Sequence, residues 1–296
     1  MSRMVDANGV KLAWREWGNG PIPVLFIHGN LASKDWIELS ARWFPGDLRV
    51  IGVDWRGCGE SEKPAPTAGY TNYTMQQHAE DMIAALDALG IERCHLATHS
   101  TGGIIAARMQ LMQPERFGKV LSLDPVSPLG LRFDEGGLGV FKAMQASKEM
   151  TRAVMATAAA SLFAAESMMP GNTPKFREGL GEAQKLFDRI IDQTFAVSEG
   201  IWLGTPTNLT LEAESGELAA RMHELDHEHL VLWGELDGWI PAADVKRMAE
   251  EMPDCRLVKV PGVGHSMNLE APALYAGYFG AFFGDEPLKV SSDSHG

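Results

Sequence analysis

One stretch of the chain decides its fold: residues 95–103 read His-Leu-Ala-Thr-His-Ser-Thr-Gly-Gly. Residues 95–98 predict a short buried strand, and Ile104–Met112, which Pro114 ends, predict a helix. Ser100 therefore lies at a sharp turn between a strand and a helix, and the two glycines after it are small enough to let neighbouring elements approach. We expect the Ser100 side chain to point out of the sheet.

Strand-like and helix-like segments alternate on both sides of this turn. Short apolar runs that predict strands are Val10–Trp17, Val24–Ile27, Arg49–Asp54, Val120–Asp124, His229–Trp233 and Arg256–Val260. The first follows Asn8-Gly9, a pair typical of β-hairpin turns. Helical spacing is found over Met75–Leu89, Ala242–Met252 and Glu270–Phe283. Thr74 and Gln77 predict a capping box at the first of these helices. This alternation predicts an α/β fold, with a mostly parallel sheet and helices on both faces.

The alternation stops in the middle of the chain. Residues 126–226 contain no convincing strand and are rich in Ala and Met, so they predict a helical insertion after the sixth strand. The expected organisation is a core made of residues 1–125 and 227–285, a helical cap at 126–226, and a flexible polar tail at 286–296. Five phenylalanines predict that the cap supplies an apolar pocket; they are Phe133, Phe141, Phe163, Phe176 and Phe187.

Composition excludes several classes of partner. The chain has 296 residues and a formal net charge of −13, which argues against nucleic acid or an anionic membrane as a partner. Most of the excess lies in residues 212–254, which hold twelve acidic and three basic residues and are expected to be solvated surface. Three separated cysteines indicate a reducing compartment. With no secretory signal or apolar span in view, we expect a cytoplasmic protein that binds a small molecule, and homo-oligomer formation is left open.

Candidate reactive groups follow the predicted strands, where an open parallel sheet forms its crevice. A serine hydroxyl needs a base, ordinarily histidine, and the histidine needs a carboxylate to orient it. The chain supplies this set in the order Ser100, Asp237 and His265. The helix that begins after Ser100 directs backbone N–H groups at the same point, which suits a developing oxyanion.

With these motifs, the chain resembles capped enzymes of the α/β-hydrolase fold over essentially residues 5–284. The matching segments are His28-Gly29, Asp54–Ser61, His99–Gly103, Trp233–Asp237 and Pro261–His265. Each is weak alone, but five of them in the right order at strand ends are highly specific.

The resemblance implies a function and a role for each site residue. Ser100 would be the nucleophile, His265 its base and Asp237 the orienting acid. The backbone N–H groups of Asn30 and Thr101 would form the oxyanion hole. The implied activity is that of a serine hydrolase that cleaves an ester or lactone of a small, hydrophobic substrate through an acyl-enzyme, without cofactor or metal. His28 and His99 would be structural groups beside the turn.

One departure from the family pattern leaves alternatives open. Thr98 stands two residues before Ser100, where the family string has Gly. A Ser or Thr at this position resembles the cofactor-independent dioxygenases of the same fold. In some of these enzymes the histidine pairs with an acid at the end of the strand that follows the nucleophile helix. Asp124 has that position, although the surroundings of Asp237 match the acid loop better. A carbon–carbon bond hydrolase is a further alternative, but many of those have Trp after the catalytic His, where this chain has Ser266.

Two alternatives to serine or dioxygenase chemistry also fit parts of the sequence. One is a non-catalytic ligand-binding protein of the same fold, against which the complete Ser, Asp and His set argues. The other is a zinc site, because His223–His227 fits the metalloprotease string H-E-x-x-H. Zinc would need both histidines on one helical face. The string ends two residues before a predicted strand, so we expect His227 to lie in a loop.

Overall fold

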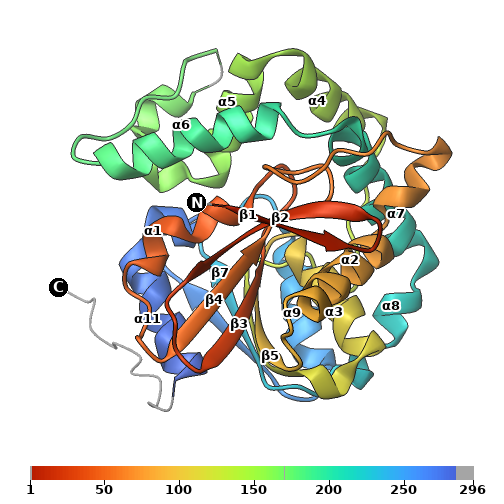
Figure 1. The fold of residues 1–296 in the computed structure, drawn as a ribbon. Coiled ribbons are helices and arrows are strands. Elements are labelled where there is room, and N and C mark those ends of the chain that lie inside the picture. The colour runs from red at the N-terminus through yellow and green to blue at the C-terminus, as the bar shows by residue number, and fades with distance from the viewer. Residues whose placement is uncertain (1, 170, 285–296) are drawn as a thin grey trace.

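A computed structural model describes residues 2–169 and 171–284, and the predicted flexible tail, 286–296, lies outside the described residues. An eight-stranded sheet runs through it, in the order β1-β2-β4-β3-β5-β6-β7-β8 (Figure 1). The strands are β1 (Arg3–Ala7), β2 (Val10–Trp17), β3 (Ile22–Ile27), β4 (Leu48–Val53), β5 (Cys94–His99), β6 (Phe117–Leu123), β7 (His229–Gly234) and β8 (Cys255–Val260). The β1–β2 and β2–β4 pairs are antiparallel, whereas the remaining pairs, from β4–β3 to β7–β8, are parallel. The predicted α/β fold with a mostly parallel sheet is confirmed.

The antiparallel edge comes from the Asn8-Gly9 turn. Asn8 has φ 49° and Gly9 has φ 77°, the left-handed pair that a tight hairpin requires, so β1 folds back along β2. The Asn8 side chain also donates a hydrogen bond to Asp81 Oδ1 at 2.9 Å, which connects the turn to the helix Met75–Ala88.

Helices cover both faces of the sheet, as predicted (Figure 1). On one face lie α2 (Met75–Ala88), α3 (Gly102–Met112) and α9 (Ala242–Glu251); on the other lie α1 (Glu38–Ala41) and α11 (Pro272–Phe283), preceded by the short α10 (Met267–Glu270). Thr74 caps α2, since its Oγ1 accepts the N–H of Gln77 at 3.0 Å. The predicted capping box is wrong in its second half, because the Gln77 amide donates to Asp81 instead, at 3.3 Å.

Between β6 and β7 the described chain is helical and adds no strand to the sheet. The insertion contains α4 (Glu135–Ala146), α5 (Lys148–Ala158), α6 (Gly181–Phe195), α7 (Thr205–Ser215) and α8 (Glu217–Ala220). α4, α5 and α6 lie together beyond one end of the sheet, whereas α7 and α8 lie beside α2 and α3 (Figure 1). Arg108 of α3 binds Glu212 of α7 at 2.6 Å, so the last part of the insertion packs on the core.

The hydrophobic core fills both sides of the central strands. Val24, Leu25, Phe26, Ile27, Leu96, Leu121 and Leu230 are fully buried. This explains why β3, β5, β6 and β7 read as short apolar runs rather than as alternating patterns. Among the helices that the structure describes, none is long and apolar enough to cross a lipid bilayer.

Candidate active site

Ser100 lies directly after β5 in a strained backbone conformation. Its φ is 53°, in the left-handed region that costs a non-glycine residue about 1–3 kcal/mol. The Ser100 N–H donates to Leu123 O at 3.0 Å, and the Ser100 carbonyl accepts two further backbone N–H groups. The turn also needs glycine nearby, because a Cβ on Gly102 would lie 2.2 Å from Ile27 O and one on Gly29 would lie 2.9 Å from Ser100 Cβ. The predicted sharp turn is therefore present.

Thr98 is accommodated where the family string has glycine. The side chain is fully buried, and its Oγ1 donates to Ser122 Oγ on β6 at 3.0 Å. The hydroxyl of a neighbouring strand thus satisfies the one polar group that the larger side chain brings. Ser122 gave no signal in the sequence, since only strand pairing brings it opposite Thr98.

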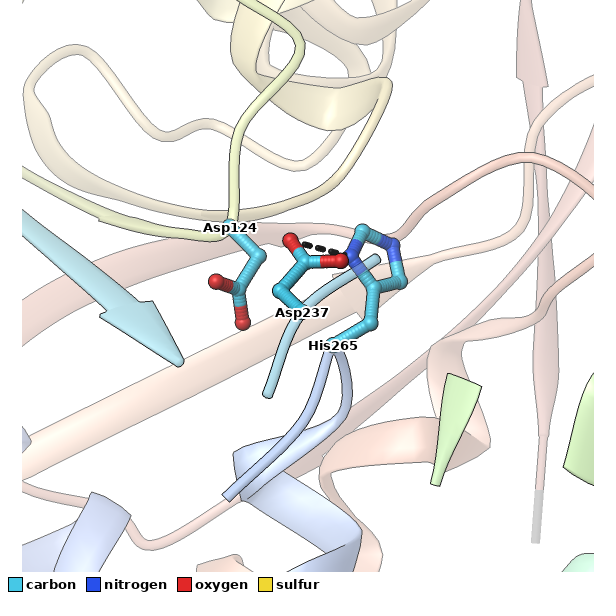
Figure 2. A group of neighbouring side chains, drawn as sticks. All are labelled: Asp124, Asp237 and His265. Carbon is cyan, nitrogen blue, oxygen red and sulfur yellow. Dashed lines mark hydrogen bonds and ion pairs between the residues drawn. The ribbon is translucent and has the colours of Figure 1, made fainter. Parts of the chain in front are cut away.

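Asp237 and His265 come together from the loops that follow β7 and β8 (Figure 2). His265 Nδ1 donates to Asp237 Oδ2 at 3.1 Å, and both side chains are buried. Asp237 Oδ1 accepts the backbone N–H groups of Trp239 at 2.7 Å and Ile240 at 3.4 Å. Burial opposes ionisation of Asp237, but His265 and these N–H groups outweigh it and hold its pKa below the ordinary value. The pair therefore holds His265 with Nε2 directed away from the carboxylate.

Asp124 lies beside this pair but makes a different contact (Figure 2). It follows β6 with φ 43° and is fully buried. Its Oδ1 accepts the Gly234 N–H at 2.7 Å, whereas its Oδ2 is buried without a hydrogen-bond partner among the described residues. Burial, helped by the negative charge of Asp237, raises the pKa of Asp124 well above its ordinary value. The two carboxyl groups thus differ: the surroundings of Asp237 favour its carboxylate form, whereas those of Asp124 favour its protonated form.

Asp124, Asp237 and His265 are also a possible ligand set, because their ligand atoms lie within 4.8 Å of one another. Two features favour a hydrogen-bonded cluster over a metal centre. The Nδ1 atom that faces Asp237 already donates a hydrogen bond to it, and a metal needs deprotonated ligands, which the surroundings of Asp124 disfavour.

His28 and His99 are neutral groups that support the turn. The Nε2–H of His99 donates to the backbone carbonyl of His265 at 2.8 Å, and burial lowers the pKa of His99 to about 3. His28 accepts the Trp55 N–H at 3.2 Å, and burial lowers its pKa to about 4. Neither ring is a base near neutral pH, and both hold loops at the site.

A cavity of about 300 Å³ joins these groups to the insertion. Ser100, Thr101, Asn30 and His265 are among the residues that line it. Within the described chain, the N–H groups of Asn30 and Thr101 donate to no protein acceptor, and Asn30 Oδ1 is buried without a partner. Unpaired donors beside a serine are what an oxyanion hole requires.

The rest of the cavity is apolar. Its wall includes Phe133, Phe141, Met144, Val154 and Met155 from the insertion. No Lys, Arg, Asp or Glu occurs among the described residues that line it. The other three phenylalanines predicted for the pocket do not line it: Phe163, Phe176 and Phe187 pack on one another with ring centroids 4.3–5.5 Å apart, and so stabilise the insertion itself.

The H-E-x-x-H string does not form a helical zinc motif. His223 lies in a 3₁₀ turn, Met222–Glu224, that ends before His227. His227 is in a loop, as predicted, and its Nε2 donates to Pro114 O at 2.9 Å. The spacing therefore does not place the two histidines on one helical face.

Two residues near the site escaped the sequence motifs. Trp239 stacks on the His265 ring, with centroids 5.4 Å apart and an interplanar angle of 16°. Glu270 accepts hydrogen bonds from the loop that carries His265. Neither Glu270 nor Trp239 belongs to a recognisable motif, so only the fold reveals these contacts.

Comparison with known proteins places the geometry in a family. A family model described as "alpha/beta hydrolase fold" matches residues 22–272. A curated relative, the dihydrolipoyllysine-residue acetyltransferase component of the acetoin cleaving system of Cupriavidus necator, is 28% identical over 273 residues. That match covers 90% of this chain and 65% of the relative, so the chain spans just under two thirds of that protein.

Solved structures share the fold over nearly the whole chain. The bromoperoxidase from Bacillus anthracis gives a TM-score of 0.76 at 21% identity and covers 96% of this chain and 100% of its own. The esterase from Exiguobacterium antarcticum gives a TM-score of 0.73 at 20% identity and covers 96% of this chain and 99% of its own. At these identities the likeness establishes the fold.

Proposed function

Because this chain belongs to the α/β-hydrolase fold family, we propose that it is a serine hydrolase that cleaves an ester or lactone through an acyl-enzyme. The observation that carries the proposal is that Ser100 and His265 line one cavity, while Asp237 accepts a hydrogen bond from Nδ1 of His265. This is the arrangement in which a weak serine nucleophile gains a base and the base gains an orienting carboxylate.

Each group then has a definite part in the reaction. Ser100 Oγ attacks the carbonyl carbon while His265 Nε2 takes the hydroxyl proton, and Asp237 stabilises the resulting imidazolium. The N–H groups of Asn30 and Thr101 bind the oxyanion, each worth about 3 kcal/mol in the transition state. His265 gives its proton to the departing alcohol, and water then releases the acyl group from Ser100.

The cavity supports a small, apolar substrate. With about 300 Å³ of space and no charged side chain in its described lining, it offers nothing to pair with a carboxylate, phosphate or ammonium group. Burying such a charge without a partner would be costly, so the group bound here is neutral. The α4–α6 part of the insertion acts as the cap that closes over it.

The contact of His265 favours hydrolysis over the dioxygenase alternative. In that alternative Asp124 would orient the histidine, but Asp124 instead accepts the Gly234 N–H and Asp237 binds His265. A carbon–carbon bond hydrolase is less well supported, since those substrates that carry a carboxylate would find no cation in the cavity lining.

A labelling and turnover experiment tests the proposal. We expect wild-type protein to hydrolyse p-nitrophenyl esters or lactones and to be labelled covalently by a fluorophosphonate. Ser100→Ala should lose both, with kcat about 10⁶-fold lower. Ser215→Ala, at the end of α7 and outside the cavity, is the matched control and should behave as wild type. An active Ser100→Ala variant that consumes oxygen would instead establish the dioxygenase.

A further inference from the structure

The carboxylate of Glu270 holds the loop that carries His265. Its Oε1 accepts the backbone N–H of Gly264 at 3.0 Å and that of Ser266 at 3.0 Å. These two residues flank His265, so one side chain fixes the backbone on both sides of the imidazole. Glu270 lies at the end of α10, a short helix whose own packing anchors it. Hydrogen bonds to a carboxylate are about twice as strong as those between neutral groups.

The same carboxylate also holds the insertion. Ser161, in the 3₁₀ turn Ala160–Leu162 that follows α5, donates to Glu270 Oε2 through its N–H at 3.1 Å and its Oγ at 2.5 Å. Val154, Met155 and Ala158 of α5 line the cavity. Glu270 therefore connects the wall that contacts the substrate to the loop that carries the base.

A second contact joins the same two parts of the molecule. The Trp239 N–H binds Asp237 Oδ1, and the Trp239 ring stacks on His265. Its indole N–H donates to Thr157 Oγ1, near the end of α5, at 3.0 Å. Thr157 and Ser161 are four residues apart, so one short stretch of the insertion meets both the acid loop and the histidine loop.

We propose that Glu270 is a positioning residue, which docks the His265 loop on the insertion and so sets the direction of the imidazole toward Ser100. This inference rests on the proposed serine chemistry. Asp237 acts on the ring itself, whereas Glu270 acts only through the backbone on either side of it. Positioning matters because a displacement of about 1 Å in a reacting group costs about 100-fold in rate.

Glu270→Gln is the informative variant, since it keeps the size but has one acceptor oxygen where the carboxylate has two. Its amide nitrogen cannot accept the Ser161 N–H, so that bond is lost while the single oxygen still serves the loop N–H groups. We expect kcat for a p-nitrophenyl ester to fall by about 10–100-fold, with KM changed less than about twofold. Hydrogen–deuterium exchange of residues 262–267 should become faster. Glu251→Gln, at an exposed glutamate of α9 paired with Arg247, is the control and should match wild type in both measurements.

Ser161→Ala separates the two sides of the bridge and guards against misfolding of the first variant. It removes only the Oγ donor from the insertion, so we expect a fall in kcat of about 2–5-fold and faster exchange in the same loop. Wild-type kcat in folded Glu270→Gln, or a loss of activity that only follows the unfolded fraction, would overturn the assignment.

The design also separates this proposal from the serine chemistry. Wild-type protein that is neither labelled by fluorophosphonate nor active on esters would remove the proposed function. Faster exchange of the loop in Glu270→Gln would still support the positioning role in that case, and unchanged exchange would overturn it.

Discussion

Two aspartates lie beside His265 and hold their protons differently. Asp237 has three hydrogen-bond donors and a pKa below the ordinary value, whereas Asp124 has one donor and a raised pKa. Glu270 also contributes negative charge near Asp124. Like charges this close cannot both ionise cheaply, so the surroundings favour ionisation of Asp237 and oppose that of Asp124.

Asp124→Asn should stabilise the protein, and more so at higher pH. In the folded chain Asp124 keeps its proton above its unfolded pKa of about 3.9, so wild-type stability falls as pH rises from there toward the raised folded pKa. The asparagine has no proton to lose, and its advantage should grow by up to about 1.4 kcal/mol per pH unit in that window. Thermal unfolding at pH 4 and pH 8 measures this.

Exposed Asp254 gives the matched control, Asp254→Asn, for which we expect the same small effect at both pH values. An advantage of Asp124→Asn that stays constant from pH 4 to pH 8 would contradict a raised pKa of Asp124.

At the scale of single elements, the β5–Ser100–α3 unit is the most constrained. The chain leaves β5, turns through the left-handed Ser100 and enters α3 within three residues, against the end of β3. A side chain on Gly102 would meet Ile27 O at 2.2 Å, and backbone cannot yield as a flexible side chain can. The sharp turn thus depends on glycine for close approach, not for a positive φ.

Gly102→Ala should destabilise the protein by about 1–3 kcal/mol and lower kcat, because the added Cβ forces α3 away from β3. Gly139→Ala, within α4, is the control: its Cβ would meet nothing within 4 Å, and alanine favours the helix by about 1 kcal/mol. Urea unfolding of both variants tests this. Equal stability of Gly102→Ala and wild type would show that α3 adapts without cost.

The unit also shows what a sequence can predict. Strand ends, glycine-containing turns and the short motifs around Ser100, Asp237 and His265 are local features, so the sequence predicts them together with the parallel sheet. The bond between Thr98 and Ser122, the second carboxyl at Asp124 with its unpaired oxygen, and the bridge through Glu270 join residues 24–110 positions apart. Such contacts depend on strand register and loop packing, which no single motif contains.

At the scale of the whole molecule, the helices of the insertion lie in two different places. α4 and α5 line the cavity, while α7 and α8 pack beside α2 and α3 (Figure 1). The residues predicted as the cap, 126–226, therefore include α7, which packs against α2 and α3, and the boundaries of the cap stay a prediction. The two phenylalanines that line the cavity, Phe133 and Phe141, belong to the first part, whereas α7 contributes Leu209 to the wall.

Phe141→Ala should shift the preference of the enzyme toward longer acyl chains. Phe141 lines the cavity edge-to-face with Phe133, at a centroid distance of 5.4 Å, and its removal opens apolar space. Each extra methylene that fits is worth about 1–3 kcal/mol in kcat/KM. A series of p-nitrophenyl esters measures the optimum, with Phe195→Ala, a half-exposed position of α6 outside the cavity, as control. An unchanged optimum would place the acyl chain elsewhere.

The left-handed backbone at Ser100 has a consequence for how this chain can evolve. Glycine suits that conformation better than serine, so Ser100→Gly should relieve strain while it removes the proposed nucleophile. Selection for stability and selection for turnover therefore oppose each other at one codon. If the proposed reaction were no longer needed, glycine at this position would stabilise the chain.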